Sequence, residues 1–409
     1  AHPLATIDAQ APHPPNFRQE SSPMDLKFTD EQNMLRDMAR NLCTDHSTVA
    51  VVRKMENDPI GVPAELWAQM QQTGLLGIRI PEAHGGMGMS LLDAAVVFDE
   101  FGRHLAPGPY FESSIMSAGA IVHAGAGSAH AELLAAIAKG EQIVVPAWLE
   151  PEGGYGPAGV QAKARRSGKA YVLDGVKRHV FYAKAAHKLL VLARTGKVDD
   201  ALTLLLVDAD APGLHFEQQK TMASDTQYRV RFDNVRVPFA ARVGEENRGW
   251  AAWEATLREG IVLLAAYAAG GAERALEITV QYSKDREQFG KPLGAFQALA
   301  HYMADASAVV DGAKVLVLEA AWTHDSGRHD TRLAPMAKLF ACKAFRDVTA
   351  MAQQVHGGIG FTLDYDIQLY YRRAKQLQLN WWDARTLENL IAAEVLDGPG
   401  RTIPDPFKV

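Results

Sequence analysis

The sequence predicts a three-part α+β protein with an N-terminal helical domain, a middle β-barrel or sandwich domain and a C-terminal four-helix bundle. Apolar residues recur at helical spacing in the first and last parts of the chain and alternate with polar residues in the middle. Two glycine-containing interruptions divide the last helical region. The spacing of the apolar residues changes along the chain and divides it into a helical domain at 24–141, a β domain at 142–242 and a helical bundle at 243–398. Residues 1–23 are expected to be a leader or expression remnant, and residues 399–409 are expected to be a tail.

Composition excludes several classes of protein. The 409 residues carry a formal charge of -6, which argues against a nucleic-acid or anionic-membrane surface. The two cysteines, Cys43 and Cys342, form no CxxC motif, so we expect neither a disulfide framework nor a metal site, and a reducing cytoplasm fits best. The apolar run 261–269 is far shorter than the roughly 20 residues that a membrane span needs, so we expect no membrane insertion.

The helical domain begins with a capping-box pattern. Thr29 can accept a hydrogen bond from a first-turn amide, and Gln32 can reach back to the residue at the cap. Apolar residues then recur at helical spacing, namely Met34, Leu35, Met38 and Leu42. The stretch "PEAHGGMGMS" separates this helix from a second amphipathic pattern, "LLDAAVVFDEFGRHL".

The middle region has a period of two. In "QYRVRFDNVRVP", Tyr228, Val230 and Phe232 alternate with charged residues, which is typical of a strand with one buried face. "KLLVLART" and "LTLLLVDAD" are short apolar strand candidates. Gly154 to Gly159 match GxGxxG, but a strand-like segment follows them where a dinucleotide site needs a helix. We therefore do not expect a Rossmann site.

Two interruptions in the last region carry residues suited to a ligand. The first, "REQFGKPLG", places Arg286 at the end of a helix, where it could offset the helix dipole or grip a diphosphate with its planar guanidinium. The second, "QQVHGGIG", places Gln354 just before Gly357 and Gly358, and paired glycines allow close approach of a ligand to the backbone. A purely helical scaffold would leave both patterns unexplained.

These motifs resemble those of the acyl-CoA dehydrogenase family. "YSKDREQFGKPLGAFQALAHYMAD" and "QVHGGIGFTLDYDIQLYYRRAK" carry the resemblance, and "PEAHGGMG", "VRFDNVRVP" and "GEENRGW" occur in the family's order. The similarity extends from about Met24 to Leu396. It implies the same three-domain architecture that the periods predict.

The resemblance also implies an FAD site that is shared between subunits. By this resemblance Arg286 contacts the FAD diphosphate of a neighbouring subunit, Phe289 packs beside it, and Gln354, Gly357 and Gly358 hold the adenosine end across the interface. Further candidates, for which simple packing is an equal explanation, are Gln288, Leu293 and Gln297. An oligomer is therefore implied, either a homo-oligomer or a heterotetramer with a related subunit.

The implied reaction is oxidation of an acyl-CoA to the trans-2-enoyl-CoA, in lipid or steroid catabolism, with electrons passed to an electron-transferring flavoprotein. A carboxylate must remove the α-proton. The family's usual glutamate position is Trp381 here, and Asp383, two residues on, is equally a candidate N-cap. A second family position is Gly260, with Glu259 beside it, although Glu259 could be a solvated charge. We take Glu259 as the first candidate base and Asp383 as the second.

The β domain departs from the family pattern. "HVF", from His179 to Phe181, stands where members have W-x-T under the flavin, and "AWLEPEGGYG" replaces the usual flavin loop. These departures resemble the steroid- and side-chain-degrading branch, in which two related subunits form a heterotetramer. The alternatives to an acyl-CoA dehydrogenase are a non-catalytic partner subunit of such an assembly and a related flavin oxidase or monooxygenase.

Overall fold

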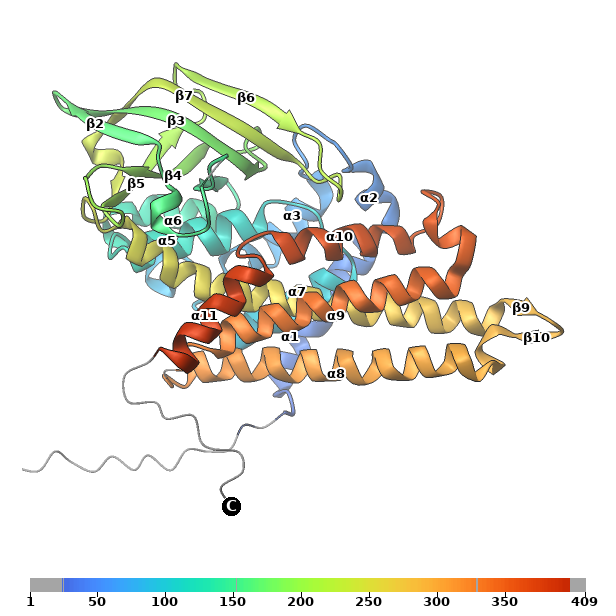
Figure 1. The fold of residues 1–409 in the computed structure, drawn as a ribbon. Helices are drawn as coiled ribbons and strands as arrows, with labels where there is room; N and C mark the ends of the chain where they lie inside the picture. The colour runs from blue at the N-terminus through green and yellow to red at the C-terminus, as the bar shows by residue number, and fades with distance from the viewer. Residues whose placement is uncertain (1–23, 25, 152, 329, 398–409) are drawn as a thin grey trace, which may run out of the picture.

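A computed structural model describes residues 24, 26–151, 153–328 and 330–397 (Figure 1). The predicted leader 1–23 and tail 399–409 lie outside the described residues. The sheet packs over the N-terminal helices, and the long C-terminal helices run side by side beneath and beyond it (Figure 1). Within the described ranges, no helix has the combination of length and apolar character needed to cross a bilayer.

The N-terminal part is helical, as the sequence predicts. The capping box at Thr29 and Gln32 is confirmed. On the first helix Leu35 and Leu42 are buried, whereas Met34 is 73% exposed, so the apolar stripe is narrower than its spacing indicates. The helices are α1 Asp30–His46, α2 Val49–Lys54, α3 Ala64–Gln72, α4 Leu91–Arg103, a π-helical segment Phe111–Ser117, α5 Ala118–His123 and α6 Ala131–Ala138.

The middle part is one mixed sheet in the order β6-β7-β3-β2-β4-β5-β8, with β1 paired in parallel to β4. Tyr228, Val230 and Phe232 are buried on β7 and alternate with exposed residues, which confirms the predicted strand. The strands are β1 Val144–Ala147, β2 Lys163–Ser167, β3 Ala170–Phe181, β4 Lys188–Arg194, β5 Leu202–Asp208, β6 Leu214–Gln219, β7 Gln227–Pro238 and β8 Arg242–Val243.

The GxGxxG match lies in a loop that is held by a buried ion pair. Glu150 accepts hydrogen bonds from the backbone N–H groups of Gln161 and Ala162, both at 2.9 Å, and from Lys177 Nζ at 2.7 Å. Within the described residues the match contains only the single 3-10 turn Pro157–Gly159, and strand β2 follows it, so the α-helix that a dinucleotide site needs after its glycines does not follow here. The absence of a dinucleotide fingerprint follows from this local structure.

The C-terminal part consists of long helices that pack closely on the N-terminal domain. A Cβ at Gly102 of α4 would lie 1.9 Å from Tyr267 O, and one at Gly270 would lie 2.0 Å from Asp99 O, so the α4 and α7 backbones touch there. The first interruption forms a hairpin of β9 Glu287–Gln288 and β10 Lys291–Pro292. The helices are α7 Gly249–Asp285, α8 Gln297–Asp325, α9 Leu333–His356, α10 Ile367–Leu379 and α11 Ala384–Leu396.

A buried lysine fixes the turn between α10 and α11. Lys338 of α9 donates to Leu377 O at 3.1 Å, and to Asn380 O and Trp382 O at 2.8 Å. Burial lowers the pKa of Lys338. Trp381 and Trp382 adopt φ values of 54° and 72°, a strained region for residues with a Cβ. The ammonium group therefore stabilises a turn that the chain does not favour locally.

Replacing Lys338 with methionine tests this role. The variant leaves three carbonyl groups without their donor, so we expect the free energy of unfolding to fall by about 3 kcal/mol or more in urea titrations. Lys343→Met, on the same helix, is the control because its 63% exposed side chain pairs only with Asp347 at the surface. Equal stability of the two variants would contradict a special role for Lys338.

Candidate functional site

The two glycine-containing interruptions meet at one end of the bundle. Arg286 follows α7, and Tyr282, one turn earlier, stacks on His356 with ring centroids 4.2 Å apart. His356 is the last residue of α9, and Gly357 follows it. Figure 1 shows the β9–β10 hairpin and the end of α9 at the same end of the molecule. We call Arg286, Phe289, Gln354, Gly357 and Gly358 the bundle-end group.

Arg286 is available for a ligand. Its backbone N–H donates to Tyr282 O at 2.9 Å, and its carbonyl accepts from Leu293 N at 2.8 Å, so the backbone is fixed. Its side chain is exposed and has no hydrogen-bond or ion-pair partner within the described residues. Phe289, at the hairpin turn, is 93% exposed. An unpaired guanidinium and an exposed aromatic ring therefore lie three residues apart in the chain, at the end of α7 and in the hairpin turn.

The glycine pair offers open backbone directly after α9. Gly357 has φ 65°, and a Cβ at Gly357 or Gly358 would meet no atom of this chain within 4 Å. Gln354 is exposed beside them. The weaker candidates differ from one another: Gln297 is exposed and Leu293 is partly buried, whereas Gln288 donates to the carbonyl of Glu287 at 2.9 Å.

Aromatic rings fill the space between the sheet and the helices. Trp381 is 4% exposed and stacks on Trp148 at 6.0 Å and on Phe181 at 6.1 Å between ring centroids. Phe111 meets it edge-on at 5.2 Å, and Trp253 lies at 6.3 Å. We call these five residues the aromatic stack. The altered segments "HVF" and "AWLEPEGGYG" supply two of its rings, but the sequence alone did not show that they meet Trp381.

Glu259 lies in an ion-paired cluster. Its two carboxylate oxygens lie 2.8 Å from Arg79 and 2.8 Å from His123 Nε2, and His324 Nε2 is 3.7 Å away. Burial opposes its ionisation, but the hydrogen bond of His123 and the charge of Arg79 outweigh that effect and lower the pKa of Glu259 to about 2. Glu259 is therefore held by ion pairs and is a weak base. The alternative interpretation, that Glu259 is a solvated surface charge, is wrong.

The structure does not bring Glu259 to the aromatic stack. Its neighbour Gly260 faces the stack, because a Cβ there would meet Met116 Sδ at 2.5 Å and Phe111 at 3.3 Å. Successive residues of a helix point about 100° apart, so Glu259 faces a different space. Its role as a base stays a prediction.

Asp383 caps helix α11, as the alternative interpretation expects. Its Oδ1 accepts from Thr386 N at 2.9 Å and from Thr386 Oγ1 at 2.6 Å. A carboxylate engaged in this way stabilises the helix and is less free to accept a proton. The catalytic role of Asp383 likewise stays a prediction.

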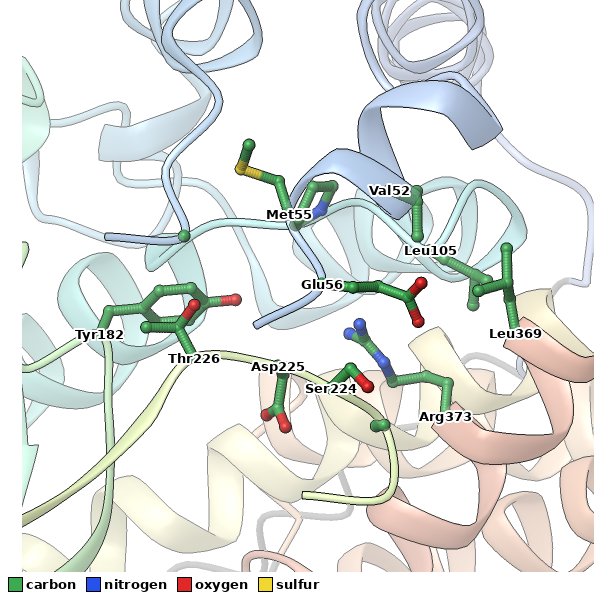
Figure 2. A pocket seen from close by; sticks show the side chains of 13 residues that line it. Val52, Met55, Glu56, Leu105, Tyr182, Ser224, Asp225, Thr226, Leu369 and Arg373 are labelled. Atoms are coloured by element: carbon green, nitrogen blue, oxygen red, sulfur yellow. The ribbon is translucent and has the colours of Figure 1, made fainter. Parts of the chain in front are cut away.

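A polar cluster that the sequence did not indicate lies beside the stack. Arg373 points toward the space between Glu56 and Asp225 (Figure 2). Its guanidinium donates to Tyr267 Oη at 3.2 Å. Burial, with the Asp225 charge, raises the pKa of Glu112 to about 8. Only tertiary packing gathers these residues, which are far apart in the sequence.

The pKa of Glu259 predicts a pH-dependent stability. Because the folded-state pKa of Glu259 lies below the ordinary glutamate value of 4.5, the ionised carboxylate stabilises the fold above about pH 4.5, and this stabilisation is lost as the pH falls toward 2. We expect Glu259→Gln to cost on the order of 3 kcal/mol at pH 7, since one pKa unit corresponds to about 1.4 kcal/mol, and roughly half of that at pH 3.

Urea titrations at the two pH values measure both differences. Glu254→Gln, one turn earlier on α7, is the control because its pair with Arg258 is partly exposed. It should cost less than about 1 kcal/mol at both pH values. A cost for Glu259→Gln that does not change with pH would refute the assignment.

Comparison with protein-family models gives three matches in chain order. The acyl-CoA dehydrogenase N-terminal domain matches residues 29–141, the middle domain residues 147–235, and the C-terminal domain residues 247–380. Together they cover most of the chain, and they correspond to the helical, sheet and helical parts of the fold.

Individual proteins are similar over nearly the whole chain. A probable acyl-CoA dehydrogenase, YngJ of Bacillus subtilis, is 31% identical over 91% of this chain and 100% of its own. The caffeyl-CoA reductase-Etf complex subunit CarC of Acetobacterium woodii is 28% identical over 85% and 93%. In the ChsE4-ChsE5 complex of Mycobacterium tuberculosis, a chain with 26% identity superposes with a TM-score of 0.83, covering 92% of this chain and 100% of that one.

Proposed function

The chain belongs to the acyl-CoA dehydrogenase family, whose members are FAD-binding oxidoreductases that act on CH–CH groups, and we propose that it takes part in the α,β-dehydrogenation of an acyl-CoA thioester to the trans-2-enoyl-CoA. When bound, FAD would supply the acceptor for the hydride of the β-carbon, and the bundle-end group would hold the cofactor. This chain's contribution is to position that cofactor within an oligomer.

The observation that carries the proposal is the unpartnered guanidinium of the bundle-end group. Arg286 is exposed at the end of α7, and Gly357 and Gly358 have open backbone at the end of α9, which the stacking of Tyr282 on His356 brings to the same end of the bundle. A planar guanidinium matches the paired oxygens of a diphosphate, and glycine backbone permits close contact with the adenosine end. We assign these residues to an FAD that is bound mainly by a neighbouring subunit.

Exposed apolar side chains at this end support an oligomer. Besides Phe289, Phe361 and Leu363 are 69% and 70% exposed on the segment that follows the glycine pair. Apolar and aromatic groups gathered on a surface are typical of protein interfaces. We therefore place the subunit contact here, either with a second copy or with a related subunit, as in the ChsE4-ChsE5 complex.

Replacing Arg286 with alanine tests the cofactor assignment. Loss of a charge-assisted hydrogen bond worth about 1.5–3 kcal/mol should weaken FAD binding roughly 10- to 150-fold in the assembled protein. Lys284→Ala removes the same charge from the last turn of α7, and it should leave the affinity nearly unchanged. Equilibrium dialysis of FAD against both variants measures the difference, and equal affinities would exclude the diphosphate contact.

The aromatic stack favours a second candidate function, that of a subunit that completes the flavin site of its partner but does not itself catalyse. Trp381 stands at the position where the resemblance predicts a glutamate, and it is held between Trp148 and Phe181. Glu259 and Asp383 each have other partners. In this case the partner subunit supplies the base.

Flavin counting together with one variant separates the two candidates. If this chain only contributes its bundle-end group to the FAD site of its partner, an assembly with a related subunit should contain one FAD for every two chains. In that case Glu259→Gln should leave the rate of flavin reduction by acyl-CoA unchanged. If it is itself catalytic through Glu259, a homo-oligomer should hold one FAD per chain, and Glu259→Gln should slow anaerobic reduction on the order of a hundredfold. Stopped-flow absorbance of the flavin gives the rate.

A relative's name supports a proposal for the electron acceptor. Because CarC belongs to a complex with Etf, we propose an electron-transferring flavoprotein as the acceptor for this chain's assembly. Rapid reoxidation by oxygen alone would instead favour the flavin oxidase or monooxygenase alternative. We place the protein in the cytoplasm, because Cys43 and Cys342 are buried free thiols.

A further inference from the structure

A cavity of about 230 Å³ lies where α1, α4, α7 and α8 meet. Neither the bundle-end group, nor the aromatic stack, nor Glu259 lines it, so it is separate from the sites described above. Its volume is below the roughly 300–1,000 Å³ of sites that enclose drug-sized ligands, so it suits a small molecule. Part of its wall consists of apolar side chains from α4, α7 and α8, namely Ala95, Val96, Ala266, Ala269, Val317 and Leu318.

Helix α1 contributes a guanidinium group that no hydrogen bond satisfies. Arg36 lines the cavity with a side chain that is 33% exposed, and its guanidinium lies 5.7 Å from the ring centroid of Phe28, a cation–π contact that orients it. Its ionic contact within the described residues, from Nε to Asp37 Oδ1, is 3.7 Å long and is not a hydrogen bond. Nε is enclosed, whereas the two Nη groups are accessible, so both can donate to a ligand.

A second guanidinium lies one turn further along α1. Arg40 also lines the cavity and is paired with the buried Glu100 through Nε at 3.2 Å and Nη2 at 2.6 Å. Its Nη1 group makes no hydrogen bond to the part of the chain that the structure describes. Like charges four residues apart on a helix destabilise one another, and an anion between Arg36 and Arg40 would remove that repulsion. Guanidinium groups bind carboxylates well because their planar N–H groups match the two oxygens.

The acidic groups in the wall already have cationic partners. Lys314 Nζ lies 2.5 Å from Glu273 and 3.5 Å from Asp99, and Glu100 is held by the second guanidinium. Among the described residues that line the cavity, Arg36 is thus the charged group without an opposite charge at hydrogen-bond distance. The cavity therefore favours an anion, and its apolar wall favours a carboxylate on a hydrocarbon tail over an inorganic ion.

We propose that this cavity binds a small monocarboxylate, with the carboxylate held by Arg36 and Arg40 and the hydrocarbon tail packed against the apolar side chains of α4, α7 and α8. The proposal does not depend on the FAD assignment, because none of the bundle-end group lines the cavity. Binding can be measured without any flavin reaction, so its failure leaves the proposed function intact.

Calorimetric titration of the full chain with three probes tests the proposal. Hexanoate carries both features, acetate lacks the long tail and 1-hexanol lacks the charge. We expect hexanoate to bind about tenfold more tightly than either, because only it uses the guanidinium groups and the apolar wall together. Arg36→Gln should abolish the preference for hexanoate over 1-hexanol. Lys54→Gln, which removes one positive charge from an exposed position of α2 outside the cavity, should keep it.

Filling the cavity distinguishes this site from any other that accepts hexanoate. Val96→Phe should prevent binding while Arg36 is intact, and Leu318→Trp, at a partly exposed position of the same wall, replaces it if the first variant fails to fold. Circular dichroism checks the fold of each variant. Absence of hexanoate binding to the unaltered protein, equal affinity for acetate, or undiminished affinity in Arg36→Gln or in a folded filled variant would each overturn the proposal.

Discussion

The contact between the buried Lys338 ammonium and three carbonyl groups of residues 377–382 is the constraint on which the centre of the molecule depends. Without it the turn would hold two tryptophans at positive φ with little local support. With it, Trp381 is fixed between Trp148, which follows β1, and Phe181 of β3 on one side and Trp253 of α7 on the other. The ammonium group of Lys338 thus holds the Trp381 ring at the junction of the three domains.

The bundle-end group, the aromatic stack and the carboxylate of Glu259 lie in three separate places in the chain. The bundle end carries an exposed guanidinium and open glycine backbone, whereas stacked rings pack at the domain junction. The ion-paired carboxylate of Glu259 belongs to neither place, since it lies at the wall of another cavity. This arrangement suits a subunit whose surface completes a site that its neighbour begins.

Local sequence determined the elements and the bundle-end group. The capping box at Thr29 and the alternation in β7 depend on neighbouring residues, so their periods and side-chain types sufficed to predict them. Arg286 and the pair Gly357–Gly358 were found because each lies beside an interruption visible in the sequence. The resemblance to a known family then linked the two interruptions, which lie about seventy residues apart.

Only the tertiary structure decided which side chains meet at the candidate site. The partners of Glu259 come from residues 79 and 123, and the rings around Trp381 come from both the sheet and the helices. These contacts cannot be predicted from a local sequence pattern, because ion pairing and ring stacking depend on how whole helices and strands pack. The sequence indicated Glu259, which is the neighbour of the family position at Gly260. Because successive residues of a helix point about 100° apart, Glu259 lies on a different face of α7 from Gly260.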